Sequence, residues 1–287
     1  LPPGAGQHLL ALSAARIISL RDTLKNVTLY AFLLVILCVL LYLFGGVRKY
    51  LVENGDRMNL WEIYIWFLST RQSQLIYFLS ILFLVGKIMN YHPGMSYYLL
   101  RMTRHSWISS QIYLVFFNVL GFNIFLLLCF CLVCGGQVTL AGEWSQASMK
   151  ASQFSVEIIG MRPVVSVSFG LLQHNPNLIG GLTFLLSLLI GNFTGLIMLL
   201  FYLKNRPVYG GICVLGLWFL DIIIEAETYL RFLRYMSPYG LSRVTRSSLN
   251  YGDTSVLYAA LFLLCADLLL SKLVCYASYD IDFVKME

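Results

Sequence analysis

The chain of 287 residues is 59% hydrophobic and 12% charged, and its formal net charge is +6. Soluble globular proteins average about 45–50% apolar and about 25% charged residues, so the composition excludes a soluble protein and predicts an integral membrane protein. The positive charge is dispersed along the chain without a block of like charges, which argues against a nucleic-acid-binding arm and favours anionic lipid headgroups as the counter-charge.

The first part of the chain has the pattern of an amphipathic helix rather than that of a span. Four apolar side chains would share one stripe of a helix over residues 9–26, namely Leu10, Ile17, Leu20 and Leu24. Such a stripe is typical of a helix that lies on the membrane surface. We therefore divide the chain into an interfacial segment, residues 1–26, and one membrane domain, residues 27–287, in which no internal repeat or flexible linker is visible.

Six apolar runs follow this segment. A membrane-spanning helix needs about 20 mostly apolar residues, because the hydrocarbon layer is about 30 Å thick and the helix rises about 1.5 Å per residue. Five runs meet or approach this length, and a sixth qualifies if its acids, Asp221 and Glu225, lie near a membrane face or inside a bundle. The predicted spans are residues 27–46, 75–91, 112–134, 178–203, 208–226 and 257–276. An even number of spans places both termini on one side of the membrane.

The connections between the spans differ in length and charge. Residues 59–69 are rich in aromatic side chains but too few to cross, so this segment either lies in the interface or dips into the membrane and returns. The connections at residues 92–111 and 204–207 are compact and basic, which would place them in the cytoplasm with both termini. The longer connections also carry many arginines, however, so the charge distribution alone leaves the orientation open.

The connection before the third span contains the densest short cationic cluster of the chain. A Pro-Gly break precedes a helix that we predict over residues 95–110. On this helix Arg101, Arg104 and His105 share one face, because positions three and four apart are neighbours. Trp107 lies on a different face. Such residues either anchor the chain at the membrane interface or dock onto a partner protein.

Three short patterns stand at defined places relative to the spans. Residues 101–111 fit Arg-x-x-Arg-x-x-Trp-x-x-x-Gln and lead directly into a span, residues 235–239 read Tyr-Met-Ser-Pro-Tyr, and residues 279–281 read Tyr-Asp-Ile. Together they resemble the ABC-2 type transporter permeases. In that family the corresponding places hold the connection between the second and third helices, an aromatic–x–Ser-Pro–aromatic signature and a basic–Asp–Ile tail. Tyr279 departs from the family because it is not basic, and the external connections are unusually cationic.

The resemblance implies an all-α permease with six transmembrane helices, an N-terminal interfacial helix and a short cytoplasmic coupling helix over residues 95–110. In the family this helix rests on a separate ATPase, which Arg101, Arg104, His105 and Trp107 would contact. Two ATPase copies and a second permease copy are implied, in the bacterial cytoplasmic membrane with both termini cytoplasmic. The expected activity is export of a peptide, lipid-like or drug-like substrate.

The chain contains no Gly-x-x-x-x-Gly-Lys-Ser/Thr loop, which is the backbone cradle that binds nucleotide phosphates. We therefore expect that it is not itself an enzyme and binds no cofactor. ATP and Mg²⁺ would be held by the partner ATPase, and the whole complex would hydrolyse ATP.

Charged residues near or inside the spans are further candidates. Lys204 and Arg206 would form a second cytoplasmic contact with the ATPase or simply anchor the membrane flank. Ionisable residues within spans are costly and indicate function by default. Asp221 and Glu225 are one helical turn apart. With Asp267 they would line a polar seam or pair with arginines of the last external connection, and the alternative is structural ion pairing.

Two further features concern packing. Gly191 and Gly195 form a Gly-x-x-x-Gly pattern, which either allows close approach of two helices or arises by chance among 22 glycines. The seven cysteines lie in or at the rim of apolar runs. This placement fits small packing residues better than disulfides or a metal site, so no metal is expected.

Two other function classes are alternatives. The pattern Glu-Ala-Glu-x-x-x-Arg at residues 225–231 is similar to the glutamate–arginine motif of membrane CAAX-type proteases, but its glutamates are not adjacent. None of the four histidines lies within a predicted span; they are His8, His92, His105 and His174. A secondary transporter or a stand-alone membrane protein would need no ATPase, but such transporters usually contain two related halves, which are not visible here.

Overall fold

The computed structural model describes residues 27–88, 104–154, 156–162, 169–244 and 255–278, so the interfacial segment predicted over residues 1–26 lies outside the described residues. Six helices occupy the six ranges predicted to span. They are α2 (Val27–Phe44), α5 (Arg71–Ile88), α7 (Arg104–Cys134), α9 (Pro176–Leu203), α10 (Pro207–Ala226) and α12 (Val256–Ala277). Five of them are long and apolar enough to cross a membrane, and α5 joins α4 (Glu62–Ser69) in a bent pair that would be a sixth span. The chain is thus a mostly helical membrane protein.

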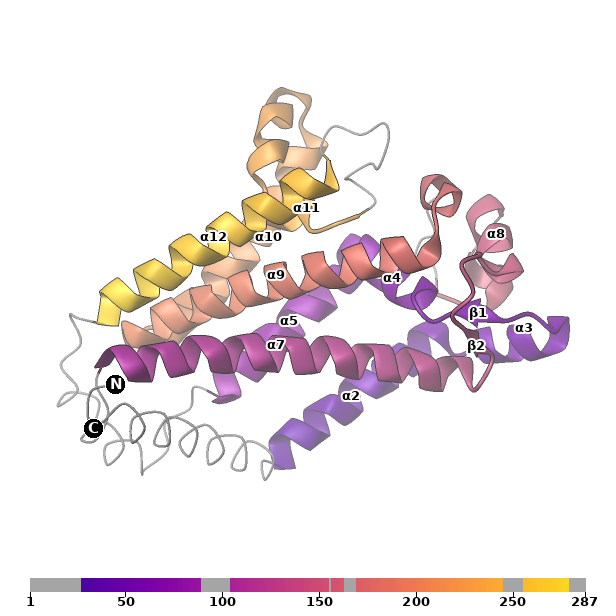
Figure 1. The fold of residues 1–287 in the computed structure, drawn as a ribbon, viewed down its shortest axis with the longest axis horizontal. Helices are drawn as coiled ribbons and strands as arrows, with labels where there is room; N and C mark the ends of the chain where they lie inside the picture. Colours follow the sequence, from indigo (N-terminus) through magenta and orange to yellow (C-terminus); the bar gives the residue numbers. More distant parts are fainter. Residues whose placement is uncertain (1–26, 89–103, 155, 163–168, 245–254, 279–287) are drawn as a thin grey trace, which may run out of the picture.

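The helix α9 is the centre of the bundle (Figure 1). It packs against α4, α5, α7, α10 and α12. The most apolar part of α9 is 61% buried, whereas that of α2, α10 and α12 is 22% buried. The latter three helices therefore turn large apolar faces outward, as lipid-facing helices do.

Two glycines bring α9 close to its neighbours. A Cβ atom at Gly191 would lie 2.6 Å from Val119 of α7 and 2.7 Å from the hydroxyl oxygen of Tyr77 of α5. A Cβ atom at Gly195 would lie 2.4 Å from Val115 of α7. Larger residues do not fit at these separations. Membrane helices therefore carry small residues where they pack closely. The Gly-x-x-x-Gly pattern therefore lies at a close helix contact, and this contact joins helices of one chain.

A sharp elbow of 92° separates α4 from α5. All eight residues of α4 are buried, whereas a helix lying in the membrane interface would expose one face. At the elbow the hydroxyls of Thr70 and Ser73 are hydrogen-bonded to each other, and the Ser73 hydroxyl also donates to the carbonyl oxygen of Phe67. This bond satisfies a backbone acceptor left open at the end of α4. Of the two arrangements open to residues 59–69, the chain adopts the one that enters the bundle and turns.

The connections after α2 and α7 form a layer at one end of the bundle, at the right of Figure 1. We call this layer the cap. It comprises α3 (Val47–Asn54), β1 (Met58–Asn59), β2 (Val138–Thr139), α8 (Gln146–Gln153), η1 (Val156–Ile159) and η2 (Phe169–Gln173). β1 and β2 pair in parallel, with Met58 opposite Val138, a short strand contact in an otherwise helical chain. The two connections run side by side there and satisfy each other's backbone groups.

A buried carboxylate attaches the cap to α4. Glu62 is fully buried, and its Oε1 accepts hydrogen bonds from the backbone amides of Asn59 at 2.8 Å and Ser145 at 3.0 Å. Its Oε2 accepts from the Ser145 hydroxyl at 2.6 Å and from the Ser148 hydroxyl. Because Ser145 is also the N-cap of α8, one side chain links α4, β1 and α8.

A contact between two glycines attaches the cap to α2. The Gly46 amide donates to the Gly160 carbonyl oxygen at 3.3 Å, and the Arg162 amide donates to the Leu43 carbonyl oxygen at 2.9 Å. A Cβ atom at Gly160 would lie only 2.4 Å from the Gly46 Cα atom, and Gly160 has a φ of +78°. Both the space and the backbone conformation therefore require glycine at this position.

We expect Gly160→Ala to lower the free energy of unfolding by about 2 kcal/mol or more, because an L-residue in this backbone region costs about 1–2 kcal/mol before any clash is counted. Thermal unfolding in detergent measures the change. The control is Gly181→Ala in α9, where a Cβ atom would have no neighbour within 4 Å and where alanine favours the helix. Equal losses in the two variants would contradict the role assigned to the glycine contact.

Candidate functional site

The described parts of both predicted basic contact regions lie at the end of the bundle opposite the cap. The start of α7, the end of α9 and the start of α10 are together at the left of Figure 1. Arg104 and His105 begin α7, although their side chains, like the whole of Arg101, lie outside the described residues. Lys204 and Arg206 are exposed in the turn between α9 and α10.

The described part of the basic segment, from Arg104 to Ser110, belongs to the same helix as the span predicted over residues 112–134. α7 runs without a break from Arg104 to Cys134, because no proline or glycine interrupts its first turns. Trp107 and Ile108 are 6% and 0% exposed. Trp107 was expected where membrane and partner meet, but it lies on the face of α7 that is packed in the protein.

The acids of α10 belong to an ion cluster. The Nη2 atom of Arg243 lies 2.8 Å from Asp221 Oδ2 and 2.9 Å from Glu225 Oε2. Arg71, at the start of α5, forms a second ion pair with Glu225. The side chains of Asp221 and Arg243 are 4% and 7% exposed. Both carboxylates are thus paired with guanidinium groups, and Arg234 Nη2 donates to the Glu225 backbone carbonyl oxygen at 3.2 Å.

The cluster corresponds to one of the two roles expected for these acids. Asp221 and Glu225 pair with an arginine from the connection after α10, which is one of the arrangements expected from the sequence. Asp267 is not part of the cluster: it lies on α12 and takes no part in these ion pairs, and its polar neighbour is Asn192 of α9. Arg71 was missed, since nothing in its own neighbourhood in the sequence indicates a partner on α10.

The segment Tyr-Met-Ser-Pro-Tyr is tied to the same cluster. It joins η3 (Thr228–Met236) to the short helix α11 (Pro238–Leu241). The Ser237 hydroxyl accepts a hydrogen bond from the Gly240 amide at 3.2 Å, which caps α11. It donates to Asp221 Oδ1 at 2.6 Å. The capping serine therefore connects α11 to α10.

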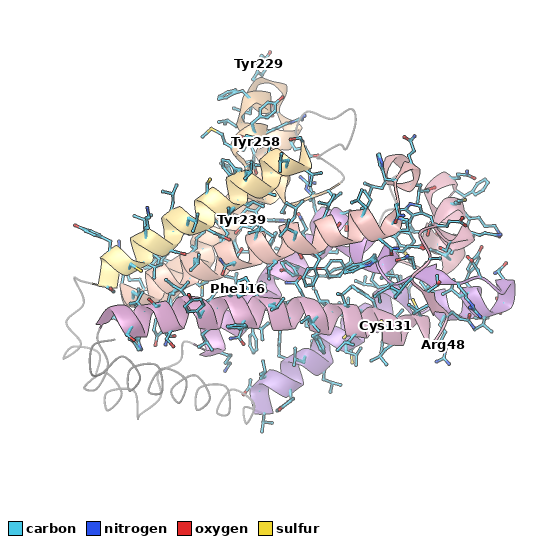
Figure 2. All side chains as sticks on the ribbon, viewed as in Figure 1. Arg48, Phe116, Cys131, Tyr229, Tyr239 and Tyr258 are labelled. Carbon is cyan, nitrogen blue, oxygen red and sulfur yellow. The ribbon has the colours of Figure 1, made fainter. Side chains whose placement is uncertain are left out.

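The last residue of this segment inserts into the bundle. Tyr239 is fully buried, and its ring lies 4.5 Å from that of Phe78 of α5 in an edge-to-face contact. Its hydroxyl oxygen is 3.3 Å from Thr194 Oγ1 of α9. Figure 2 shows Tyr239 among the helices, whereas Tyr229, 89% exposed, lies at the tip of the projecting η3. The Tyr239 side chain thus anchors α11 to α5 and α9.

A second polar cluster joins four helices inside the bundle. The Tyr64 hydroxyl of α4 donates to Asn123 Oδ1 of α7 at 2.7 Å and lies 2.6 Å from the Ser187 hydroxyl of α9. The Asn123 amide donates to the Tyr77 hydroxyl of α5 at 3.0 Å, and Tyr77 donates to the Ser187 carbonyl oxygen at 2.8 Å. All four residues are buried. Polar groups at membrane depth pair within the protein in this way, because lipid offers them no partners.

Neither cluster has the composition of a hydrolytic site. Glu225 is engaged by two arginines, and no histidine lies in either cluster. In the part of the chain that the structure describes, no three histidine, cysteine or acidic side chains are grouped so that they could hold a metal ion, and all seven cysteines are free thiols.

Neither a protein-family model, nor a curated protein, nor a solved structure matches this sequence. The functional assignment therefore depends on the patterns of the sequence and on the contacts described above.

Proposed function

We propose that this chain is the permease subunit of an ATP-binding cassette transporter of the ABC-2 type. A separate ATPase would bind at the end of the bundle that carries the start of α7 and the turn at Lys204 and Arg206. In this assignment that end is cytoplasmic, with both termini, in a bacterial plasma membrane. The cap would then lie on the outer side.

The observation that carries the proposal is the continuity of α7. A helix of 31 residues is about 47 Å long at about 1.5 Å per residue. Its first turn belongs to the basic pattern that resembles the coupling segment, and its last turn reaches the cap. A push on the basic turn would therefore move the span as one rigid body, since a helix without a break does not absorb the motion.

The contacts of α7 extend this path to the rest of the bundle. α7 packs on the two glycines of α9, and Asn123 connects it to α4, α5 and α9 through hydrogen bonds. Displacing α7 would then shift the central helices together. The docking residues would be Arg101, Arg104 and His105, whose cationic or hydrogen-bonding groups suit an acidic or carbonyl-rich surface. Buried Trp107 would position their turn.

The remaining parts of the assignment follow from the same resemblance. Two ATPase copies would carry ATP and Mg²⁺, and a second permease copy would cover part of the outward apolar faces of α2, α10 and α12. The substrate class that we propose is a peptide, lipid-like or drug-like molecule, exported rather than imported. The interior clusters are engaged in helix contacts, so the substrate path would lie outside them, against a second copy.

The test is co-purification of the permease from its native membranes with an ATPase of the ATP-binding cassette type. We expect Arg101→Glu combined with Arg104→Glu to reduce the recovered ATPase about tenfold or more, because each hydrogen bond from a charged group contributes about 1.5–3 kcal/mol.

A matched control reverses two charges at the opposite end. Lys49→Glu with Arg57→Glu makes the same change in net charge on exposed residues of the cap and should leave ATPase recovery unchanged. Equal recovery with both double variants, at equal permease yield and unfolding temperature, would refute the docking assignment.

A further inference from the structure

An acidic side chain lies in the middle of α12 and makes no ion pair in the part of the chain that the structure describes. Asp267 is eleven residues from Val256 and ten from Ala277, the two ends of α12, so it lies about 15 Å from either end of the helix. Its side chain is 7% exposed. Helix α12 packs most extensively on α9, and from α9 the Asn192 side chain is the polar neighbour of the Asp267 carboxyl.

Two oxygen atoms at this contact lack a hydrogen-bond partner. They are Oδ1 of Asp267 and Oδ1 of Asn192, and both are buried. A buried carboxylate without a cation, or a buried carbonyl without a donor, costs several kcal/mol at membrane depth. The two unsatisfied atoms are both acceptors, so each lacks a donor.

The neighbouring elements do not supply that donor. The titratable or charged residues of the helices that pack on α12, and of α12 itself, are Tyr202 on α9, Tyr239 on α11, Arg104, His105, Tyr113, Cys129, Cys131 and Cys134 on α7, and Tyr258, Cys265, Lys272, Cys275 and Tyr276 on α12. α9 carries no charged residue, and the Tyr239 hydroxyl is directed to Thr194. Lys272 is exposed, and it lies five residues from Asp267, on a different side of the helix.

We propose that Asp267 and Asn192 form an intramembrane proton-binding site. One proton on Asp267 Oδ1 would be donated to Asn192 Oδ1, while the Asn192 amide N–H donates to the other carboxyl oxygen. This reciprocal pair of hydrogen bonds satisfies both open acceptors with a single added atom. The pair carries no charge, which suits its depth in the bilayer.

The site has a consequence for the packing of α12 on α9. With the proton bound, the two side chains hold the helices together by two hydrogen bonds. Without it, a carboxylate oxygen faces the carbonyl oxygen of Asn192, and the two repel each other. Binding of the proton and close packing of α12 are therefore linked, independently of whether an ATPase drives the chain.

Infrared spectroscopy of the full-length protein in lipid tests the proposal directly. We expect the carbonyl stretching band of a protonated carboxylic acid at neutral pH, shifted in heavy water, and lost in Asp267→Asn. That variant places an amide opposite an amide and should keep the unfolding temperature of the wild type, whereas Asp267→Ala should lower it. The controls are Glu62→Gln and Asp221→Asn, the other two deeply buried acids, which should retain the band assigned to Asp267.

Two further measurements keep the proposal open to refutation if Asp267→Asn fails to fold. Asn192→Asp changes only the group that receives the proton, so the Asp267 band should change its position. The unfolding temperature should be the same in sodium chloride and in choline chloride. A wild type without the band, a band that Asn192→Asp leaves in place, or stabilisation by sodium would each overturn the assignment, the last in favour of a metal cation.

Discussion

Replacing Arg243 by methionine should lower the free energy of unfolding by about 3–5 kcal/mol, the range for removing one partner of a buried ion pair. The loss is expected to be large because Asp221 is 4% exposed and loses the guanidinium group 2.8 Å from its carboxylate. Methionine fills a similar volume without supplying charge. The effect is measured by unfolding the purified protein in detergent with heat or denaturant.

A double variant separates the cost of the stranded charge from the cost of lost packing. Asp221→Asn combined with Arg243→Met removes both charges but keeps an oxygen that can accept the Ser237 hydrogen bond. It should therefore recover much of the stability lost in Arg243→Met. The exposed pair of Lys49 and Glu53, whose side chains are 79% and 60% exposed, supplies the control, since Lys49→Met should cost well under about 1 kcal/mol. Similar values for Arg243→Met and Lys49→Met would refute the role of the cluster.

The ion cluster and the central polar cluster have different positions in the bundle. The first holds α10 and α11 to the start of α5, near the surface, where Arg71 and Glu225 are about a third exposed. The second lies among α4, α5, α7 and α9 and is fully buried. α5 takes part in both. In the proposed transporter a motion of α7 would reach α10 through α9, on which both helices pack, as well as through α5. The partly exposed pair of Arg71 and Glu225 is the contact that salt can most readily weaken.

The helices could be predicted from the sequence because a membrane-spanning run is a local property. Twenty apolar residues identify a span whatever surrounds them, and the predicted range 208–226 differs from α10, Pro207–Ala226, by one residue. The continuity of α7 from Arg104 into the span could not be predicted, because composition alone cannot separate a polar first turn from a separate helix. The elbow at Thr70 likewise has no distinctive pattern in the sequence, where residues 59–69 show only a short aromatic run.

The contacts between distant segments could not be predicted in the same way. The four members of the central polar cluster lie on four helices, and each is an isolated polar residue in an apolar run. Only the fold shows that they meet. Glu62 was overlooked for a related reason, because its partners Ser145 and Ser148 belong to another connection of the chain. Arg71 and Glu225 are similarly distant in sequence.

Glu62→Ala should be about as destabilising as the loss of Arg243 and should act on the cap. The substitution leaves two backbone amides and two hydroxyls without their acceptor, and each unsatisfied buried donor costs about 1–3 kcal/mol. Rotation of the two serine hydroxyls relieves part of this cost, so we expect a total of about 3–5 kcal/mol. Limited proteolysis should show faster cleavage within residues 135–153, because these residues lose their attachment to α4.

Two further variants serve as comparisons for the effect of Glu62→Ala. Glu62→Gln keeps the shape and one carbonyl oxygen, so it should retain the acceptor for the two backbone amides and cost about 1–2 kcal/mol. Glu143→Ala removes an exposed acid from the same connection and should change neither the stability nor the cleavage rate. If Glu62→Ala behaves like Glu143→Ala in both measurements, the other contacts of the cap hold it in place; they include the strand pair, the glycine contact and the hydrogen bond from Asn59 to Asn177 of α9. Its rigidity would then not depend on the buried carboxylate.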